Sequence, residues 1–166
     1  MRVVLALGSN LGDRFDTLQG ALDCLFDAPG LDFVAVSPVY ETEPVGGPEQ
    51  GPYLNAVVIA QTSIIEPLTL LERALGVENA FGRVRTERWG ARTLDVDLIT
   101  VGDVVSDGPE LTLPHPRAHE RAFVLVPWSQ VDPDAVLSGR RVADLLAGLD
   151  QAGVRLRADL TLQRPV

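Results

Sequence analysis

The stretch Arg2-Val-Val-Leu-Ala-Leu-Gly-Ser-Asn-Leu-Gly-Asp13 predicts a buried strand that leads through a turn into a helix. Residues 2–7 form the strand, because a short apolar run bounded by turn residues is typical of a buried strand. Gly8 to Gly12 supply the turn, and Asp13 has a side chain suited to cap the first backbone N–H groups of a helix. An apolar stripe at helical spacing follows, to about Phe26: Leu18, Ala21, Leu22 and Leu25.

Outward from this unit, apolar and turn residues predict three further strands. These strands are expected over residues 32–40, 53–62 and 93–101. A second helix is expected from about Glu66-Pro67, because proline is favoured in a first turn. Its apolar stripe is predicted to be Leu68, Leu71, Leu75 and Glu78. A short hairpin around Gly102-Asp103 and helices near residues 116–126 and 141–149 complete the expected elements.

The predicted order is β-α-β-β-α-β followed by C-terminal helices, which indicates the α+β class. Helices that cross over between strands in this order suggest a ferredoxin-like sandwich, with a mainly antiparallel sheet flanked by helices. A length of 166 residues fits one domain, 1–166, without repeats or linkers. Two irregular segments, residues 41–52 and 82–92, are expected to be long active-site loops, since long ordered loops in compact domains are usually functional.

The overall charge and the apolar runs exclude several classes of protein. A formal net charge of −9 disfavours a nucleic-acid-binding protein, which would carry a basic face. No apolar run is long enough to span a bilayer, and the N-terminus lacks the pattern of a signal peptide. The single cysteine, Cys24, cannot form an internal disulfide, which fits a reducing compartment. We expect a cytoplasmic monomer that binds small molecules, and neither nucleic acid nor a membrane.

Asp95-Val96-Asp97 is a candidate metal site. Side chains at positions i and i+2 of a strand point to one face, so the two carboxylates would lie side by side while Val96 faces the core. Mg²⁺ is typically held by one or two carboxylates together with substrate phosphates. The alternative is a solvated strand face without a ligand, which a lone Asp-x-Asp usually is.

The arginines just before this pair favour the functional interpretation. Four of them fall within ten residues: Arg83, Arg85, Arg88 and Arg92. Guanidinium groups bind phosphate oxygens bidentately and stay charged, and Trp89 offers a flat face for stacking. An exposed loop with scattered salt bridges is the alternative. Cations beside carboxylates are what phosphoryl transfer needs, because catalysis there is mostly positioning and charge stabilisation.

Tyr53 and Asn55 form a second cluster on one face of a predicted strand. They offer a ring for stacking and an amide that both donates and accepts hydrogen bonds, and Phe123 could supply another ring. Such a set suits a flat heterocycle with a mixed donor and acceptor edge, such as a pterin. On spacing alone these would be core residues, although a buried Asn still needs a partner.

Together these motifs closely resemble the hydroxymethyl-dihydropterin pyrophosphokinase family over about residues 3–128. The motifs occur in this order: Gly8-Ser-Asn-Leu-Gly12, Tyr53-Leu-Asn55, Gly82-Arg-Val-Arg85, Glu87-Arg-Trp-Gly-Ala-Arg-Thr-Leu-Asp-Val-Asp97, Leu113-Pro-His-Pro116 and Arg121-Ala-Phe123. The stretch from Arg88 to Asp97 is highly specific, whereas Gly8 to Gly12 alone would be a weak signal.

The resemblance implies a ferredoxin-like fold and the transfer of pyrophosphate from ATP to the hydroxymethyl group of a reduced pterin, with release of AMP, in folate biosynthesis. It implies that two Mg²⁺ ions are held by Asp95 and Asp97. The catalytic groups would be Asp95, Asp97, Arg83 and Arg92. The pterin would be bound by Thr42, Val45, Tyr53, Asn55, Trp89 and Phe123. ATP would be bound by Leu71, Leu75, Glu78, Arg83, Arg85, Trp89, Arg92, Leu98, Thr112, His115 and Arg121.

Three positions depart from the residues common in that family: Thr86, Glu110 and Pro116. They affect expectations about ATP affinity rather than about the reaction. Two other functions remain open from the sequence. One is a different Asp-x-Asp nucleotidyl- or phosphotransferase, which would not need Tyr53 and Asn55. The other is a non-catalytic ferredoxin-like module that binds a small molecule and needs no Mg²⁺.

Overall fold

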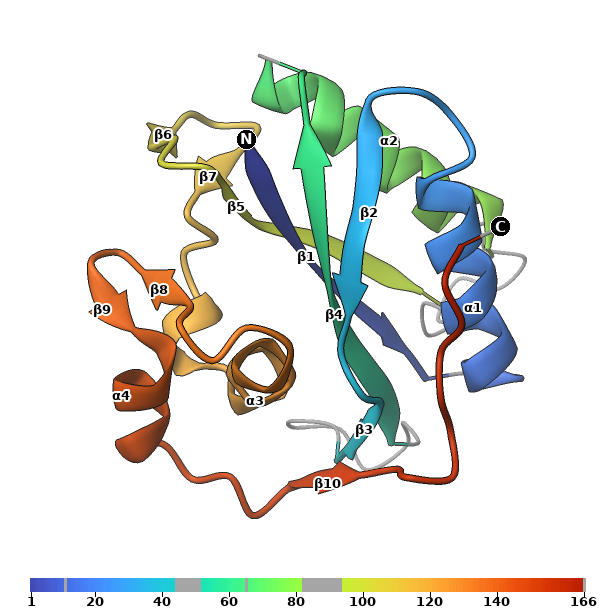
Figure 1. Cartoon of the computed structure of the whole chain (residues 1–166), viewed down its shortest axis with the longest axis vertical. Coiled ribbons are helices and arrows are strands. Elements are labelled where there is room, and N and C mark those ends of the chain that lie inside the picture. The colour runs from blue at the N-terminus through green and yellow to red at the C-terminus, as the bar shows by residue number, and fades with distance from the viewer. Residues whose placement is uncertain (11, 44–51, 65, 82–93, 166) are drawn as a thin grey trace.

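A mainly antiparallel sheet forms the centre of the computed structural model, which describes residues 1–10, 12–43, 52–64, 66–81 and 94–165 (Figure 1). Its strands are β1 (Arg2–Ser9), β2 (Leu31–Val36), β3 (Tyr40–Thr42), β4 (Tyr53–Thr62), β5 (Asp95–Val101) and β10 (Val154–Leu156). The order is β10-β3-β4-β1-β5, and β2 also pairs with β4. Every one of these pairs is antiparallel. The α+β class and the antiparallel sheet are confirmed, whereas the ferredoxin-like arrangement stays a prediction.

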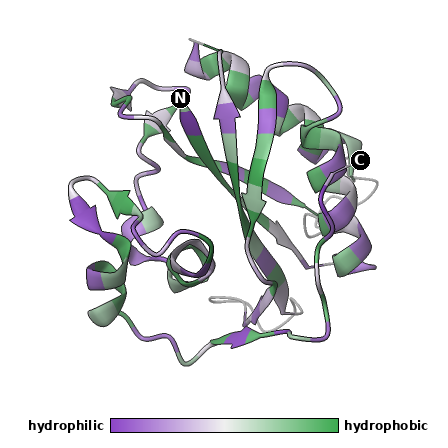
Figure 2. Cartoon of the chain, in the orientation of Figure 1, coloured by the Kyte–Doolittle hydropathy of each residue, from purple (hydrophilic) through white to green (hydrophobic). Residues whose placement is uncertain are grey.

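Helices cover both faces of this sheet (Figure 1). Helices α1 (Arg14–Leu25) and α2 (Pro67–Ala80) pack on one face and α3 (Ala122–Val131) on the other, while α4 (Val142–Ala147) packs against α3. Alternation along β1 produces these two cores, because Val3, Leu5 and Leu7 enter the first while Val4 and Ala6 enter the second. Figure 2 shows the middle of β1 as hydrophobic, while hydrophilic and hydrophobic colours alternate along α1.

Smaller elements join the last strand to the C-terminus. They are the hairpin of β6 (Ser106–Asp107) with β7 (Thr112–Leu113), the 3-10 helix η1 (Ala118–Glu120), and the hairpin of β8 (Val136–Leu137) with β9 (Arg140–Arg141). The hairpin expected at Gly102-Asp103 is therefore only a turn, and the paired strands follow it. The helix expected near 116–126 is divided into η1 and α3, with Arg121 between them.

Helix α1 is confirmed in both its cap and its buried face. The Asp13 carboxylate accepts a hydrogen bond from the Asp16 backbone N–H at 3.0 Å, which satisfies one of the donors that a helix N-terminus leaves unpaired. The predicted stripe is the buried one: Leu18, Ala21, Leu22 and Leu25. Burying each leucine contributes roughly 1.5–3 kcal/mol, so this helix is held mainly by its sheet-facing side.

The stripe predicted for α2 is confirmed at Glu78 and wrong at Leu68 and Leu75. The buried residues are Leu70, Ala74, Val77 and Glu78. Leu68 and Leu75 are instead 42% and 38% exposed. The leucines of this segment fit two overlapping apolar faces of the helix. The face that includes Ala74 is the buried one, because its small side chain lets the helix lie close to the sheet.

The strand expected over residues 32–40 is two strands. Pro38 has no backbone N–H, so the ladder with β4 cannot continue through it. Ser37 replaces the missing bonds, because its N–H donates to the Val57 carbonyl and its hydroxyl accepts from the Val57 N–H, both at 2.9 Å. The chain resumes pairing as β3, which places Thr42 opposite Tyr53.

The C-terminal segment, residues 150–164, crosses the end of the sheet and returns along α1 (Figure 1). We call it the strap. Its strand β10 pairs with β3, and Leu162 is buried in the core beneath α1. Near its end, the Gln163 backbone N–H donates to Gln19 Oε1 at 2.8 Å, and Gln19 Nε2 donates to the Gln163 carbonyl at 3.0 Å. The sequence predicted no structure here.

The Glu41 carboxylate on β3 anchors the strap. Guanidinium nitrogens of Arg14, Arg155 and Arg157 lie 2.8, 3.0 and 3.2 Å from its oxygens. Its hydrogen bond from Arg14 and the three positive charges lower the pKa of Glu41 below its ordinary value of 4.5, against a smaller opposing effect of burial.

Acid is therefore expected to weaken the fold through Glu41. A carboxyl whose pKa is lowered on folding stabilises the protein above its ordinary pKa, and that contribution is lost as the pH falls through the folded value. Urea denaturation from about pH 6 to about pH 3 should show a smaller loss of unfolding free energy for Glu41→Gln than for the wild type. Identical pH profiles would contradict this assignment.

No helix among the residues that the structure describes is long and apolar enough to cross a membrane.

Candidate functional site

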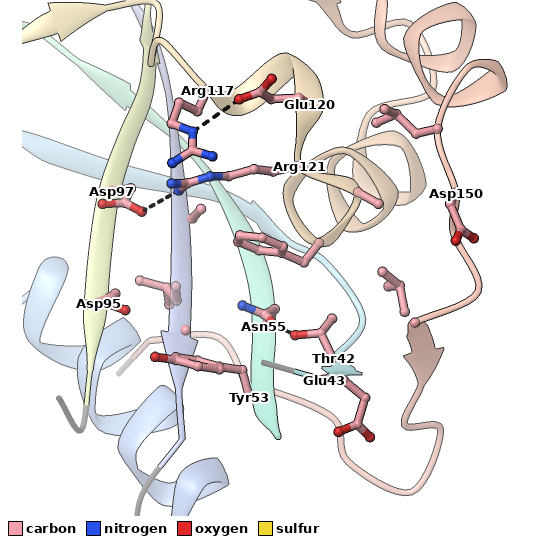
Figure 3. Close-up of a pocket in the computed structure, with 18 residues that line it drawn as sticks. Thr42, Glu43, Tyr53, Asn55, Asp95, Asp97, Arg117, Glu120, Arg121 and Asp150 are labelled. Carbon is pink, nitrogen blue, oxygen red and sulfur yellow. Dashed lines mark hydrogen bonds and ion pairs between the residues drawn. The ribbon is translucent and has the colours of Figure 1, made fainter. Parts of the chain in front are cut away.

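A cavity of about 810 Å³ opens on the α3 side of the sheet (Figure 3). Strands β1, β3, β4 and β5 form its floor, the beginning of α3 lies over it, and the segment that leads into β10 forms the far wall. Its lining residues are Ala6, Leu7, Gly8, Thr42, Glu43, Tyr53, Asn55, Asp95, Asp97, Arg117, Glu120, Arg121, Ala122, Phe123, Leu149, Asp150, Gly153 and Val154. Seven of the predicted site residues meet here: Thr42, Tyr53, Asn55, Asp95, Asp97, Arg121 and Phe123.

Both aspartates project from β5 into this cavity (Figure 3). The alternation predicted from the sequence holds, since Leu94, Val96 and Leu98 are no more than 4% exposed on the opposite side. In the register of the sheet, Asp95 lies opposite Gly8 and Gly8 lies opposite Asn55. Asp95 and the Asn55 amide thus belong to one row across three strands, and Asp97 lies in a parallel row opposite Ala6.

Gly8 leaves open space on the cavity floor between Asp95 and Asn55, because it has no side chain. A Cβ atom at this position would lie 3.0 Å from Asn55 Nδ2 and 3.5 Å from Tyr53 Cδ2. Any larger residue would push against the amide and the ring. The sequence indicated only a turn for this glycine, because close approach across strands is visible only once the strands are paired.

The amide of Asn55 is oriented by Thr42. The Thr42 hydroxyl donates to Asn55 Oδ1 at 2.6 Å, and both residues are 6% exposed. This bond identifies Oδ1 as the amide atom that faces Thr42, and leaves Nδ2 as the donor that can reach a ligand. Tyr53 on the same strand lies beside this pair (Figure 3), which gives a polar edge next to an aromatic ring.

Arg121 brings positive charge to the carboxylates from the beginning of α3. Its Nη1 atom lies 3.9 Å from Asp97 Oδ2. Its guanidinium carbon lies 5.5 Å from the centroid of the Phe123 ring, within the range of a cation–π contact. At the rim, Arg117 donates to Glu120 at 3.1 Å. Negative, positive and aromatic groups therefore share one cavity.

Glu78 lies behind the aspartates rather than in the cavity. It is 4% exposed, and its Oε2 accepts a hydrogen bond from the Val96 backbone N–H at 2.7 Å. Val96 is the residue between Asp95 and Asp97, so Glu78 holds the backbone of the carboxylate pair from helix α2. Its predicted contact with ATP stays a prediction.

Removing the Glu78 carboxylate is expected to weaken the fold. Glu78→Ala leaves the buried Val96 N–H without this acceptor, and an unsatisfied buried donor costs roughly 1–3 kcal/mol. Chemical denaturation should show this loss. Glu78→Gln keeps an acceptor oxygen and should recover most of it. A Glu78→Ala protein as stable as the wild type would contradict the role of this bond.

The other predicted ATP residues that the structure describes lie outside this cavity. Leu98 is in the core beneath α2, Leu71 is half-buried and Leu75 exposed on α2, and Thr112 is exposed on β7. His115 lines a second cavity of about 350 Å³ together with His119. Burial lowers the pKa of His115, the charge of Asp97 opposes this shift, and Arg121 and Arg117 add to it.

Several predictions fall outside the described residues. They concern Val45, Arg83, Arg85, Trp89 and Arg92, together with most of the two expected loops.

Most residues of the far wall of the cavity were not predicted from the sequence. Leu149, Asp150, Gly153 and Val154 come from a segment without a recognisable motif. Glu43, Arg117 and Glu120 lie one to four residues from predicted site residues. Proximity to Thr42 and Arg121 in the sequence was the one signal that could have indicated these three.

Comparison with known proteins identifies the family of the chain. The sequence profile of the family described as 7,8-dihydro-6-hydroxymethylpterin-pyrophosphokinase (HPPK) matches residues 4–133. A 2-amino-4-hydroxy-6-hydroxymethyldihydropteridine pyrophosphokinase of Mycobacterium leprae is 52% identical over 179 residues, which are 98% of this chain and 91% of the relative. The protein of the same name from Mycobacterium tuberculosis is 48% identical over 184 residues, 99% of this chain and 96% of the relative.

Solved structures support the fold. The chain resembles Plasmodium falciparum HPPK-DHPS, crystallised with pteroate, with a TM-score of 0.68 and 15% sequence identity. The match covers 88% of this chain and 42% of that one, so the chain spans less than half the length of this structural relative. Because the family profile and these relatives cover most of its length, the chain belongs to the 7,8-dihydro-6-hydroxymethylpterin-pyrophosphokinase family.

Proposed function

We propose that the chain transfers the pyrophosphoryl group of ATP to the hydroxymethyl group of 6-hydroxymethyl-7,8-dihydropterin and releases AMP, as a step of folate biosynthesis. The observation that carries this proposal is the shared cavity. It combines a carboxylate pair suited to phosphate-bound cations with an amide and aromatic rings suited to a pterin, in a chain of this family. We expect the enzyme to act in the cytoplasm as a monomer.

The donor set of the cavity fits Mg²⁺. Asp95 and Asp97 supply hard oxygen ligands from one face of β5. No group of three or more metal-binding side chains occurs among the described residues. Two carboxylates without a complete protein cage match the way Mg²⁺ is usually held, with water and substrate phosphates filling the remaining positions. When bound, two such ions would neutralise the triphosphate and increase the acidity of the pterin hydroxyl.

The pterin is proposed to lie over Gly8, with its edge on Asn55 and its ring against Tyr53 and Phe123. In the register of β1, β4 and β5, Asn55 and Asp95 flank the same glycine. This arrangement directs the hydroxymethyl group toward the carboxylate pair. On this proposal, the row across the strands would set how far the nucleophile lies from the phosphate site.

The remaining groups are proposed to hold ATP. Arg121 lies next to Asp97, and Arg83 and Arg92 are expected to join it at the phosphates, because arginine stabilises charge on the transferring group. The pterin hydroxyl oxygen attacks the β-phosphorus. The bond between that phosphorus and the oxygen bridging to the α-phosphate breaks, and AMP leaves with this oxygen. The hydroxyl proton passes to solvent, and we assign no side chain as general base.

Product analysis tests the proposal. The protein is incubated with ATP, Mg²⁺ and the reduced hydroxymethyl-pterin, and the nucleotides are separated. AMP and a pyrophosphorylated pterin in equal amounts are expected. Release of ADP or of free pyrophosphate would instead indicate another phospho- or nucleotidyltransferase. Pterin binding without any turnover would indicate a binding module.

A further inference from the structure

The far wall of the cavity is built by the strap. Asp150, Gly153 and Val154 line the cavity, and Val154 pairs with Thr42 in the β10–β3 ladder. β3 has only three residues and lies between β4 and β10. The position of Thr42 therefore depends on pairing with β10 on one side and with β4 on the other. The strap also lies beyond residue 133, where the match to the family profile ends.

Glu41 connects the elements around this wall. Its carboxylate forms ion pairs with Arg14 of α1 and with Arg155 and Arg157 of the strap, with nitrogen–oxygen distances of 2.8 to 3.2 Å. Arg14 also donates to the Pro52 carbonyl at 2.9 Å, just before β4 begins. One carboxylate thus joins the beginning of α1, the beginning of β4 and the strap. Its side chain is only 15% exposed, so the ion pairs are partly shielded from solvent screening.

Glu41 itself does not face the cavity. It precedes Thr42 in β3, and successive side chains of a strand point to opposite faces. Thr42 lines the cavity and Glu41 does not. An effect of Glu41 on a ligand is therefore indirect, through the backbone of β3 to the Thr42 hydroxyl and the Asn55 amide that it orients, and through the strap residues that line the cavity.

Replacing Glu41 would remove its own contacts and would also unbalance the charge of the arginines around it. Three guanidinium groups converge on it. Other acids offset part of their charge, since Glu43 lies 3.2 Å from Arg155 and Asp159 lies 2.8 Å from Arg157. Neutralising Glu41 would leave the three cations close together without their shared partner, and repulsion would push the strap away from β3.

We propose that Glu41 is a positioning residue for the pterin, and that it sets affinity by clamping the strap against β3 so that Thr42 and Asn55 keep their geometry. The inference rests on the assignment of Asn55 and Thr42 to the pterin under the proposed function. It extends the substrate site to the strap and to a residue that does not touch the substrate.

The variant Glu41→Gln tests this role. Loss of the clamp should raise KM for the pterin about tenfold, the order expected from weakening one or two substrate hydrogen bonds. KM for ATP and kcat should change less than about twofold, since the ion pairs of Glu41 run to α1 and the strap rather than to Asp95, Asp97 or Arg121. Glu41→Asp, which keeps the charge, should recover part of the affinity. A role in stability alone would lower the yield of folded enzyme without this selective change.

The matched control is Asp132→Asn, which removes an acid that pairs with Arg2 at 3.1 Å far from the cavity and should leave both KM values unchanged. Arg157→Gln serves as a second variant if Glu41→Gln does not fold, because it breaks the clamp at the strap only. A pterin KM within twofold of the wild type in the folded variants, or equal increases for both substrates, overturns the proposal.

Asn55→Ala, measured in parallel, separates this inference from the proposed function. If Asn55→Ala weakens pterin binding and the clamp variants do not, only the role of Glu41 is wrong. If Asn55→Ala leaves pterin binding intact, the assignment of the pterin site is wrong, and the proposed role of Glu41 in pterin affinity is then wrong too.

Discussion

Replacing Asp97 by asparagine is expected to reduce kcat by about a thousandfold or more. The carboxylate lies in the cavity beside Asp95 and 3.9 Å from Arg121. An amide of the same size offers one neutral oxygen, so it cannot balance the charge of a phosphate-bound cation. Charge stabilisation by a bound metal ion contributes several kcal/mol to the transition state, and about 4 kcal/mol corresponds to a thousandfold in rate. Steady-state AMP formation measures the effect.

The same variant provides its own control for folding. Two ionised carboxylates on one strand face repel each other in the absence of a cation, so the unfolding free energy without metal should not decrease and could increase slightly. Thermal denaturation with and without Mg²⁺ separates the two effects, because added metal should stabilise the wild type more than Asp97→Asn. Turnover within tenfold of the wild type would exclude Asp97 from the proposed metal site, and the parallel variant Asp95→Asn tests its neighbour.

The sequence predicted the parts of the site that depend on local periodicity. The period of two along β5 is enough to place Asp95 and Asp97 on one face and Val96 on the other. The period of 3.6 along α1 identifies its buried stripe. Family resemblance added Thr42 and assigned Phe123, which the residues alone suggested only as a possible ring, to the same site, and no local pattern would have done so. These residues converge because β3, β4, β1 and β5 are neighbours in the sheet.

Other features depend on pairing between distant segments and could not be predicted. The strap has a strand of three residues, too short for a recognisable alternation, and its position is set by the ladder with β3. The close approach of Gly8 to Asn55 and Tyr53 follows from the register of β1 with β4. Glu78 binds a backbone N–H of β5 that is 18 residues away in the sequence. The buried face of α2 was missed in part for a related reason, since only contact with the sheet decides between two leucine stripes.

Replacing Asn55 by alanine is expected to weaken pterin binding about five- to 150-fold and to leave ATP binding almost unchanged. The substitution removes the Nδ2 donor proposed for the substrate edge and the oxygen that accepts from Thr42 at 2.6 Å. Buried groups left without partners cost roughly 1–3 kcal/mol, which gives this range of dissociation constants. Calorimetric titration with the pterin, and separately with a non-hydrolysable ATP analogue, measures both affinities.

Asn55→Asp is the informative companion, because it retains an acceptor for Thr42 but replaces the donor with a negative charge. It should also lose pterin affinity if donation from Nδ2 is what the substrate requires. Equal losses for the two ligands, accompanied by a lower melting temperature, would instead indicate a general defect of β4.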